Sequence, residues 1–298
     1  MSAMSEVAVW EAFRALRLEG TAIHANLVRH MLERDVFAAA GDTLELGGGD
    51  GELWRAGGEP FFRRALDAGA LYVTDSDPNL VEVSRAGEVF RRDRVFVECA
   101  NVEQLPYPSQ RFTRAIVIHV LHWCETPERV ARAIAEIARV LEPDGRAFII
   151  TVDEQVHMAE VYQLMQRARA ALLEQGVRCE QEMPSISPRV LPFCAANGSA
   201  FLAAEFERVQ RIDCEYAHHV DALHPSLDVP GDAFFVAYLR TLPFIKVAMA
   251  ENRLTEAFFD ACALRFRAHL AAHGTFRMSR RDVIYDCSAP RVRGGGFG

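Results

Sequence analysis

The stretch Leu44-Glu45-Leu46-Gly47-Gly48-Gly49-Asp50-Gly51 joins a short apolar strand to a run of closely spaced glycines. Because glycine has no Cβ, such a loop lets a ligand approach the backbone directly. In an open parallel sheet this position is the carboxyl end of a strand, where ligands bind. The dinucleotide-binding pattern GxGxxG would need a further glycine at Glu52 or Trp54, so both of its registers fail. The pattern GxGxG, with an acidic residue two positions before its first glycine, fits instead.

Strands and helices alternate after this loop. Further strands are expected in the apolar runs at residues 70–74, 94–97, 112–120 and 147–150. Helical patterns lie between them, and Asp77-Pro78 and Thr126-Pro127 are typical helix starts. Strands separated by helices of this length indicate a parallel α/β sheet with right-handed crossovers.

The flanking segments are expected to be largely helical. Beyond residue 152, helical patterns lie between two expected strands at 206–216 and 277–287, which close the sheet as an antiparallel hairpin. The sequence therefore predicts a Rossmann-like, mostly parallel seven-stranded α/β sheet with helices on both faces. We expect an N-terminal helical segment (1–40), a ligand-binding core (41–152), a C-terminal part with a helical cap before the last strand (153–290) and a disordered tail (291–298).

Composition argues against several classes of function. The net charge of the 298 residues is −8, and Lys246 is the single lysine, so no basic stripe for nucleic acid is visible. No window approaches the roughly 18 unbroken apolar residues of a membrane helix. Glu6, Glu11 and Arg14 interrupt the apolar pattern at the N-terminus, unlike the core of a secretory signal. We therefore expect neither a nucleic-acid partner nor a membrane segment.

Cysteine usage predicts a reducing compartment. The seven cysteines are scattered without a CxxC pair, which fits neither a disulfide framework nor a zinc site. We expect free thiols in the cytoplasm. His119 and His122 have no third partner at metal-ligand spacing, so no metal site is expected.

Five segments together resemble one family, the class I S-adenosylmethionine-dependent methyltransferases, and in particular small-molecule enzymes similar to the quinone-methylating group. The segments lie within about residues 40 to 152. They are the glycine stretch, Thr74-Asp75-Ser76-Asp77-Pro78, Ala100 to Tyr107, Phe112 to Trp123 and Arg139 to Gly145. The resemblance implies S-adenosylmethionine as the cofactor. A tight turn without a ligand is the alternative for the glycines, and Asp75 downstream argues against it.

The resemblance also implies roles near the glycines. Gly47 would offer its carbonyl to the methionine ammonium of the cofactor, and Gly49 and Gly51 would keep the loop flat beneath it. Glu45 would support the loop or the amino group from below. Asp75, with Ser76 beside it, would accept the ribose hydroxyls.

Two further segments are implied to contact the cofactor. Asn101 would accept from the adenine amino group, although the family more often has aspartate there, so the contact loses a charge. Val102 would offer its backbone N–H to the adenine ring. His119 would face the methionine end. One of His119 and His122 is a candidate general base or substrate contact, and structural packing is the alternative for both.

Several positions depart from the family pattern. The interval from Gly51 to Asp75 is long, and Gly57-Gly58-Glu59-Pro60 interrupts the first crossover helix. Thr113 and Asp144 replace residues that are usual in the family. These departures weaken the assignment to a subgroup more than they weaken the assignment of the cofactor.

The lead hypothesis is a methyltransferase that acts on a small, largely apolar molecule, with specialised-metabolite biosynthesis as its expected context. Phenylalanines dominate the cap, and they either line an apolar pocket or fill a helical core. A protein or peptide methyltransferase, or a cofactor-binding cyclase that no longer methylates, are the alternatives. The amphipathic N-terminal helix with Trp10 and Phe13 either covers its own site or docks on a second copy, which would give a homo-oligomer.

Overall fold

The computed structural model describes residues 4–49, 51–186, 188–223 and 230–291, and the chain divides into two compact units. One unit comprises residues 1–20, 155–188 and 215–280, and the other comprises residues 21–154, 189–214 and 281–298. We call them the helical unit and the sheet unit. Strands β7 (Phe206–Asp221) and β8 (Thr275–Pro290) contribute to both, since a boundary falls within each. The predicted disordered tail, apart from Arg291, lies outside the described residues.

The sheet unit is built on a mostly parallel sheet, as predicted. Its parallel strands are β2 (Thr43–Leu46), β3 (Leu71–Asp75), β4 (Val95–Cys99), β5 (Phe112–Ile118) and β6 (Leu141–Val152). The strand order is β7-β8-β6-β5-β2-β3-β4, and β8 runs antiparallel to β6. The carboxyl ends of β2, β3 and β5 therefore meet at one edge, where the glycine loop begins.

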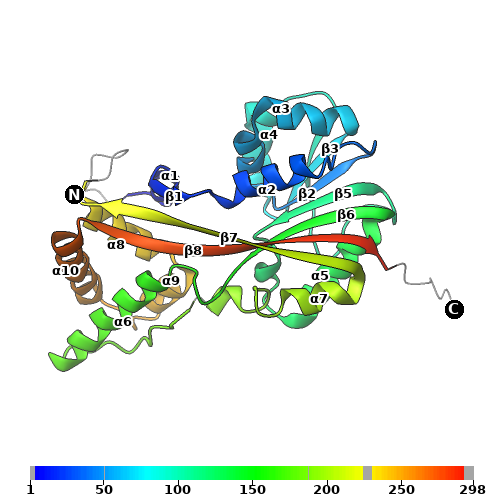
Figure 1. Ribbon diagram of the computed structural model, residues 1–298. Coiled ribbons are helices and arrows are strands. Elements are labelled where there is room, and N and C mark those ends of the chain that lie inside the picture. Colours follow the sequence, from blue (N-terminus) through cyan, green and yellow to red (C-terminus); the bar gives the residue numbers. More distant parts are fainter. Residues whose placement is uncertain (1–3, 50, 187, 224–229, 292–298) are drawn as a thin grey trace. The chain divides into compact units, whose positions relative to one another are not determined.

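Helices cover both faces of this sheet (Figure 1). They are α2 (Ile23–Glu33), α3 (Glu52–Ala68), α4 (Pro78–Ala86), α5 (Pro127–Val140) and α7 (Gly198–Glu205), with short 3-10 turns η1 (Glu88–Phe90), η2 (Leu121–Cys124) and η3 (Pro188–Val190). Asp77 and Thr126 cap α4 and α5 through their side chains, as the sequence predicts. The predicted interruption of the first crossover helix is a kink in α3 at Gly58, where φ is +65°.

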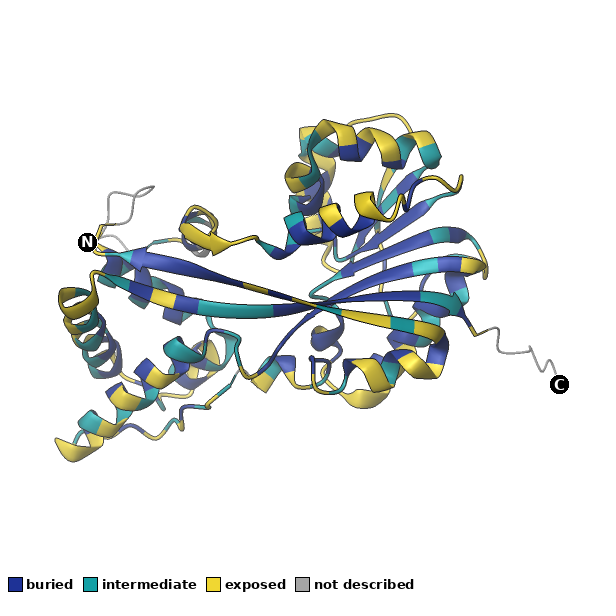
Figure 2. Ribbon diagram, in the orientation of Figure 1, coloured by how far each residue is buried: buried dark blue, intermediate teal, exposed yellow. Residues whose placement is uncertain are grey.

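The central strands are buried on both faces, which is why they read as continuous apolar runs. Strands β5 and β6 are mostly buried (Figure 2). Val117 of β5 and Ile149 of β6 are fully buried. Phe193 of the segment before α7 joins the core between the sheet and α5. Burial of this continuous apolar surface is the main source of stability for the sheet unit.

Arg114 is an exception within this core, because it is a charged residue that is 1% exposed. Its guanidinium donates to Thr43 Oγ1 at 3.0 Å and to the carbonyl oxygens of Val36, Ala39 and Gly41. Burial lowers the pKa of Arg114 to about 10, so the side chain stays protonated at neutral pH. Arg114 thus satisfies the backbone carbonyls of the loop between α2 and β2, which no helix or strand satisfies.

The helical unit packs helices around an aromatic core. Its helices are α1 (Glu6–Arg14), α6 (Ala159–Glu174), α8 (Gly231–Thr241), α9 (Pro243–Ala250) and α10 (Glu256–His273). Phe234, Phe235 and Phe258 are fully buried there, and Phe235 stacks on Phe266 with ring centroids 4.2 Å apart. Phe13 of α1 joins the same core. These phenylalanines fill a helical core, which is the plainer of the two interpretations that the sequence allowed.

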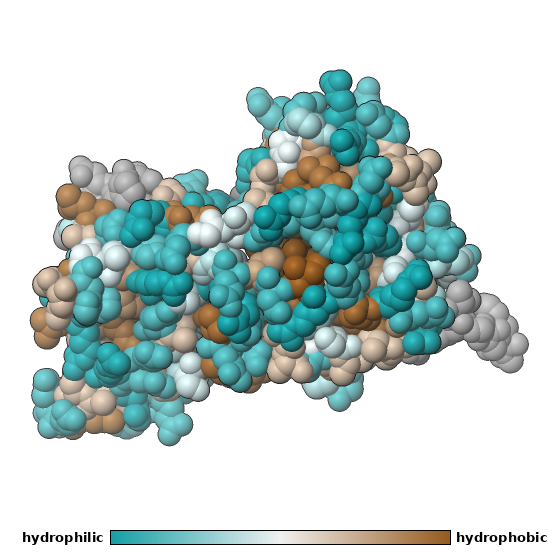
Figure 3. Space-filling model, in the orientation of Figure 1, coloured by the Kyte–Doolittle hydropathy of each residue, from teal (hydrophilic) through white to brown (hydrophobic). Residues whose placement is uncertain are grey.

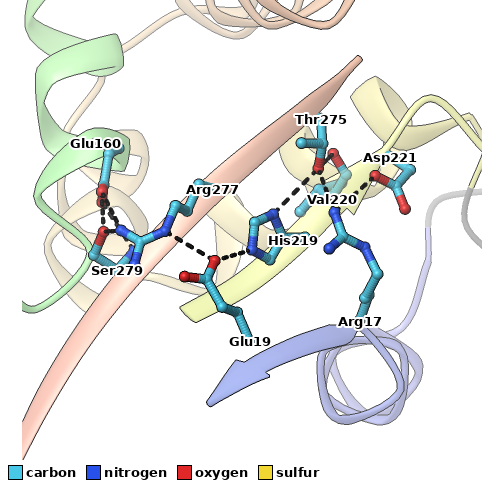
Figure 4. Close-up of polar contacts among 9 residues, drawn as sticks. All are labelled: Arg17, Glu19, Glu160, His219, Val220, Asp221, Thr275, Arg277 and Ser279. Atoms are coloured by element: carbon cyan, nitrogen blue, oxygen red, sulfur yellow. Dashed lines mark hydrogen bonds and ion pairs between the residues drawn. The ribbon is translucent and has the colours of Figure 1, made fainter. Parts of the chain in front are cut away.

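An eighth strand, β1 (Arg17–Gly20), lies within the segment expected to be helical. It pairs antiparallel with β7, and Leu18 lies opposite His218. Polar contacts tie it to its neighbours, since Glu19 accepts from His219 at 2.8 Å and from Arg277 at 3.2 Å (Figure 4). All four residues of β1 are exposed, so the strand has no apolar pattern and depends on pairing with β7.

Most side chains on the face drawn in Figure 3 are hydrophilic, and the apolar ones form small, separate groups. In the described part of the chain, no single helix has the length and apolar composition to cross a bilayer. The pair α8 and α9, bent by 79° at the break between them, meets those two criteria only when both helices are taken together.

Candidate functional site

The glycine loop at the end of β2 is folded against the end of β3. The backbone N–H groups of Gly47 and Gly48 both donate to the carbonyl oxygen of Thr74, at 2.8 and 3.0 Å. Gly47, Gly49 and Gly51 have φ values of +69°, +51° and +83°, a region that favours glycine. The predicted loop therefore requires its glycines for conformation as well as for access.

The three predicted loop glycines differ in what surrounds them. A Cβ on Gly47 would lie 2.3 Å from Val120 Cγ2, and one on Gly51 would lie 2.8 Å from the ring of Phe90. A Cβ on Gly49 would meet nothing within 4 Å, so it would project into open space. Gly49 is thus the position where the missing side chain leaves room above the loop.

A cleft of about 570 Å³ opens above this loop, entirely within the sheet unit. That volume is within the usual range of small-molecule sites, about 300–1,000 Å³. The predicted site residues on its wall are Gly47, Gly49, Asp75, Ser76, Asn101, Val102 and His119. Among the described residues, Glu45, Gly51 and His122 are predicted site residues that do not line it. The structure therefore gathers most of the predicted cofactor contacts on one surface.

The acidic end of β3 forms one side of the cleft. Asp75 is the last residue of β3, and its Oδ1 accepts from the N–H of Asp77 at 3.0 Å, which fixes the carboxylate at the mouth of the loop. Ser76 beside it is exposed. Asp77 also lines the cleft, although its carboxylate caps α4. Asp75 and Asp77 thus add two negative charges to the wall of the cleft.

The segment after β4 forms the next part of the wall. Asn101 Oδ1 accepts from the N–H of Glu103 at 2.9 Å, which holds the turn that presents Asn101 and Val102 to the cleft. Arg129 lies on the same wall, but its guanidinium pairs with Glu103 at 2.6 Å and with Glu125 at 2.9 Å. The charge of this cleft is therefore acidic on balance, and it suits a cationic ligand.

Glu45 lies below the loop rather than in the cleft. Its carboxylate is buried and accepts from Trp54 Nε1 at 2.6 Å. Burial raises the pKa of Glu45 to about 8, with the Trp54 hydrogen bond acting in the opposite direction. Glu45 is therefore mostly protonated at neutral pH when the cleft holds no ligand.

This burial predicts a pH-dependent cost in stability. Folded Glu45 keeps its proton up to about pH 8, whereas the unfolded carboxyl loses it near pH 4.5, so the free energy of unfolding falls as pH rises between these values. Glu45→Gln should remove this decline and raise stability at neutral pH by about 1–3 kcal/mol. Urea unfolding across this pH interval measures the effect. Exposed Glu88→Gln, the control, should change stability by less than about 0.5 kcal/mol, and a parallel decline in Glu45→Gln would contradict the assignment.

His119 lies on the cleft wall where β5 ends. It has a φ of +55°, which is uncommon for a residue with a Cβ, and its N–H donates to Ile150 of β6 at 3.1 Å. Its Nε2 lies 3.5 Å from Oδ2 of Asp282, a β8 residue that is 0% exposed. His122 is buried, with its ring centroid 6.3 Å from that of His119. Of the two predicted histidines, His119 is the one with access to the cleft.

Some residues of this site were missed by the sequence reasoning. Trp123 lines the cleft with 57% of its surface exposed, and the guanidinium of Arg189 lies 3.9 Å from the centre of its ring. Asp282 is separated from His119 by most of the chain, so no local pattern points to it. Burial raises the pKa of Cys124 to about 11, which keeps this lining thiol protonated. In the described residues no group of acidic, histidine or cysteine side chains forms a metal site.

Known proteins match the region that forms this cleft. A family model described as a methyltransferase domain matches residues 44–149. The ubiquinone/menaquinone biosynthesis C-methyltransferase of Bordetella parapertussis is 33% identical over 108 residues, which is 36% of this chain and 39% of that protein. An uncharacterized methyltransferase of Mycobacterium tuberculosis is 31% identical over 121 residues, or 40% of this chain and 44% of that protein. The chain thus spans about two fifths of the length of these relatives.

A solved structure extends the likeness in fold. The structure of a putative methyltransferase from Bacillus halodurans aligns with a TM-score of 0.50 and covers 89% of this chain and 99% of that one. Sequence identity is 13%, so this likeness concerns the fold alone. The match confirms the predicted Rossmann-like α/β class, with eight strands in place of the expected seven.

Proposed function

Since residues 44–149 match a methyltransferase domain, we propose that this chain is a class I methyltransferase that transfers the methyl group of S-adenosylmethionine to a small molecule. The observation that carries the proposal is the cleft that joins the glycine loop of β2 to Asp75 of β3. An acidic cleft with an open backbone suits a cofactor that bears a sulfonium and an ammonium group. The residues present therefore fit the cofactor in both charge and access.

Each part of the wall has a proposed role. Asp75 accepts the two ribose hydroxyls, with Ser76 beside it, and Asn101 and Val102 hold the adenine. Gly47 offers its carbonyl to the ammonium group. Gly49 and Gly51 shape the loop, and Glu45 supports it from below through its contact with Trp54.

The chemistry requires little of the protein beyond position. Bound S-adenosylmethionine supplies a methyl group that is activated by a positively charged sulfur. The chain holds donor and acceptor close and aligned, which is worth roughly 7–11 kcal/mol in favourable cases. The apolar side chains of Leu46, Ile118 and Val120 line the cleft and limit access of water.

We infer that the acceptor is small and largely apolar. The apolar lining near His119 supports this, as does the quinone-biosynthesis enzyme among the relatives. The phenylalanines of the helical unit do not carry the inference, because they are packed in its core. We place the protein in the cytoplasm, because all seven cysteines are free thiols.

A pair of glycine substitutions tests the proposed binding surface. Gly49→Ala should weaken binding of S-adenosylhomocysteine at least about tenfold, a cost of about 1.4 kcal/mol, because its methyl group would enter the space above the loop. Gly176→Ala is the matched control, since Gly176 also has a positive φ of +74° and also has nothing within 4 Å of an added Cβ, but it belongs to the helical unit. Calorimetric titration measures both, and equal affinity of the two variants would contradict the proposed surface.

A further inference from the structure

We propose that Asp282 is a positioning residue that orients His119 as a proton acceptor, and that the methyl acceptor is therefore a molecule that must lose a proton from a hydroxyl group or an enol. This inference rests on the proposed function, because it concerns the reactive end of the same cleft. It adds a residue from the far end of the sequence and a chemical class of substrate. All the residues involved belong to the sheet unit.

The imidazole of His119 lies on the wall of the cleft. His119 follows β5 directly, and the carboxyl end of β5 borders the glycine loop of β2, since Leu46 lies opposite Val117. The side chain of His119 is 23% exposed and lines the cleft beside Gly47 and Ile118. The imidazole therefore lies where the ammonium end of the cofactor and the acceptor would meet.

The backbone of His119 has an unusual conformation. Its φ of +55° belongs to the left-handed region, which is uncommon for a residue with a Cβ. The hydrogen bond from its N–H to Ile150 fixes this conformation at the end of β6. A strained residue on the wall of a cleft is a reason to look for function.

A buried carboxylate lies beside the ring of His119. Asp282 lies on β8 opposite Val152, and its Oδ2 is 3.5 Å from Nε2 of His119. Asp282 is 0% exposed, so water cannot stabilise its charge. A buried carboxylate beside an imidazole favours the tautomer with its proton on the facing nitrogen, and it stabilises the imidazolium that forms when the other nitrogen takes up a proton.

The surroundings of the two ring nitrogens of His119 indicate a missing partner. Both are shielded from solvent, and neither has a hydrogen-bond partner among the described residues. A buried nitrogen without a partner is costly, and in a native structure it calls for an explanation. In the proposed arrangement the ring turns toward Asp282, which pairs Nε2, and the same turn brings Nδ1 to an acceptor hydroxyl in the cleft.

Other titratable and charged groups lie around His119 and Asp282. His122 on η2 is the next ring, with its centroid 6.3 Å from that of His119. On β7, the thiol pKa of Cys214 is raised to about 11 by burial and by the charge of Asp282, and Arg29 of α2 acts on it in the opposite direction. Cys214 therefore stays a neutral thiol at physiological pH. Asp282 is the carboxylate that faces His119.

These contacts define the proton transfer. The acceptor O–H bond breaks, and its proton goes to the ring nitrogen of His119 that carries no proton. The electron pair left on the oxygen becomes available to form a bond. An oxygen acceptor forms the new bond to the methyl carbon directly, and an enol does so through its carbon while the C=O bond re-forms. The bond from that methyl carbon to sulfur breaks, and its electron pair stays on sulfur. A neutral amine attacks with a lone pair that is already free and needs no such base at the moment of transfer, so the pair favours hydroxyl and enol acceptors over amines.

The first test reads the tautomer of His119 directly. The full chain, labelled with ¹⁵N-histidine and saturated with S-adenosylhomocysteine, is examined by NMR, and His119→Gln identifies the resonance. We expect one dominant tautomer, with the proton on the nitrogen that faces Asp282. In Asp282→Asn the tautomer ratio should fall on the order of tenfold or more, since a hydrogen bond to a charged group is lost. An unchanged ratio, or the opposite tautomer in the unsubstituted chain, would overturn the proposal, and the second result does not depend on the folding of a variant.

The matched control is Asp286→Asn, the same substitution on the same strand. Asp286 is also buried, but its Oδ2 lies 2.9 Å from Nε2 of His30 and 2.6 Å from Arg146. This variant should alter the His30 resonance and leave that of His119 unchanged. Movement of both histidines in both variants would show a general disturbance of β8 and would count against a specific pair.

The second test addresses the acceptor class. Labelled S-adenosylmethionine is offered with phenols and primary amines as probe acceptors. The pair predicts transfer to a phenol, with kcat lowered about 10²-fold or more by Asp282→Asn and an unchanged KM for S-adenosylmethionine. Transfer to amines at a rate that neither Asp282→Asn nor His119→Gln alters would refute the class. A chain that fails to bind S-adenosylhomocysteine would instead refute the proposed function, and the tautomer measurement without ligand would still decide the role of Asp282.

Discussion

Replacing Asp75 with alanine is expected to weaken binding of S-adenosylmethionine at least about a hundredfold, because a carboxylate that accepts two hydroxyl groups contributes two hydrogen bonds of roughly 1.5–3 kcal/mol each. The fold should be retained. Asp75 is only partly buried at the end of β3, and the described contact of its side chain is the local one with the N–H of Asp77. Turnover should be lost along with binding.

The control for this variant is Glu82→Gln. Glu82 lies on the neighbouring helix α4, is exposed and pairs with Arg85 at 2.7 Å. This substitution removes one negative charge near the cleft without touching its wall, so it separates the field of the carboxylates from direct contact. Affinity for the cofactor should change less than about threefold, in line with the small effect of an exposed charge. Unchanged affinity in Asp75→Ala would remove the cofactor assignment at this position.

Replacing Arg114 with methionine is expected to destabilise the sheet unit by at least about 3 kcal/mol. Methionine fills a similar volume but donates no hydrogen bond, so the buried carbonyl oxygen of Val36 and the partly buried ones of Ala39 and Gly41 would lose their donor. Each buried acceptor left unsatisfied costs about 1–3 kcal/mol. The substitution also removes the desolvation penalty of the buried guanidinium charge, which offsets only part of this loss of stability.

Urea unfolding followed by far-UV circular dichroism and tryptophan fluorescence measures this effect. Arg63→Met on α3 is the control, because Arg63 is exposed and its loss should change stability by less than about 0.5 kcal/mol. A loss of stability in Arg114→Met no larger than in Arg63→Met would mean that the loop before β2 does not depend on the guanidinium.

The sequence was informative where local chemistry sets the structure. Gly47, Gly49 and Gly51 need positive φ values, and the run from Ala115 to Ile118 is apolar because the strand is buried between helices. The caps at Asp77 and Thr126 follow from side chains that can satisfy free N–H groups. Such features are readable because each depends on a few adjacent residues.

Features that depend on tertiary contacts were not readable in the same way. Strand β1 has four exposed residues and exists because β7 lies alongside it. The sequence could not separate a phenylalanine that lines a pocket from one such as Phe234, which is fully buried in a core. Asp282 acquires meaning only when β8 lies near the end of β5, and neither position predicts the other.

The most direct test of the central claim is calorimetric titration of the full chain with S-adenosylmethionine and S-adenosylhomocysteine, with NADH as a control. The acidic cleft and its glycine loop predict micromolar binding of the first two ligands and no binding of NADH, because the loop does not carry the dinucleotide pattern. Binding of NADH, or the absence of binding by both sulfur ligands, would contradict the account of this cleft as a methyl-donor site.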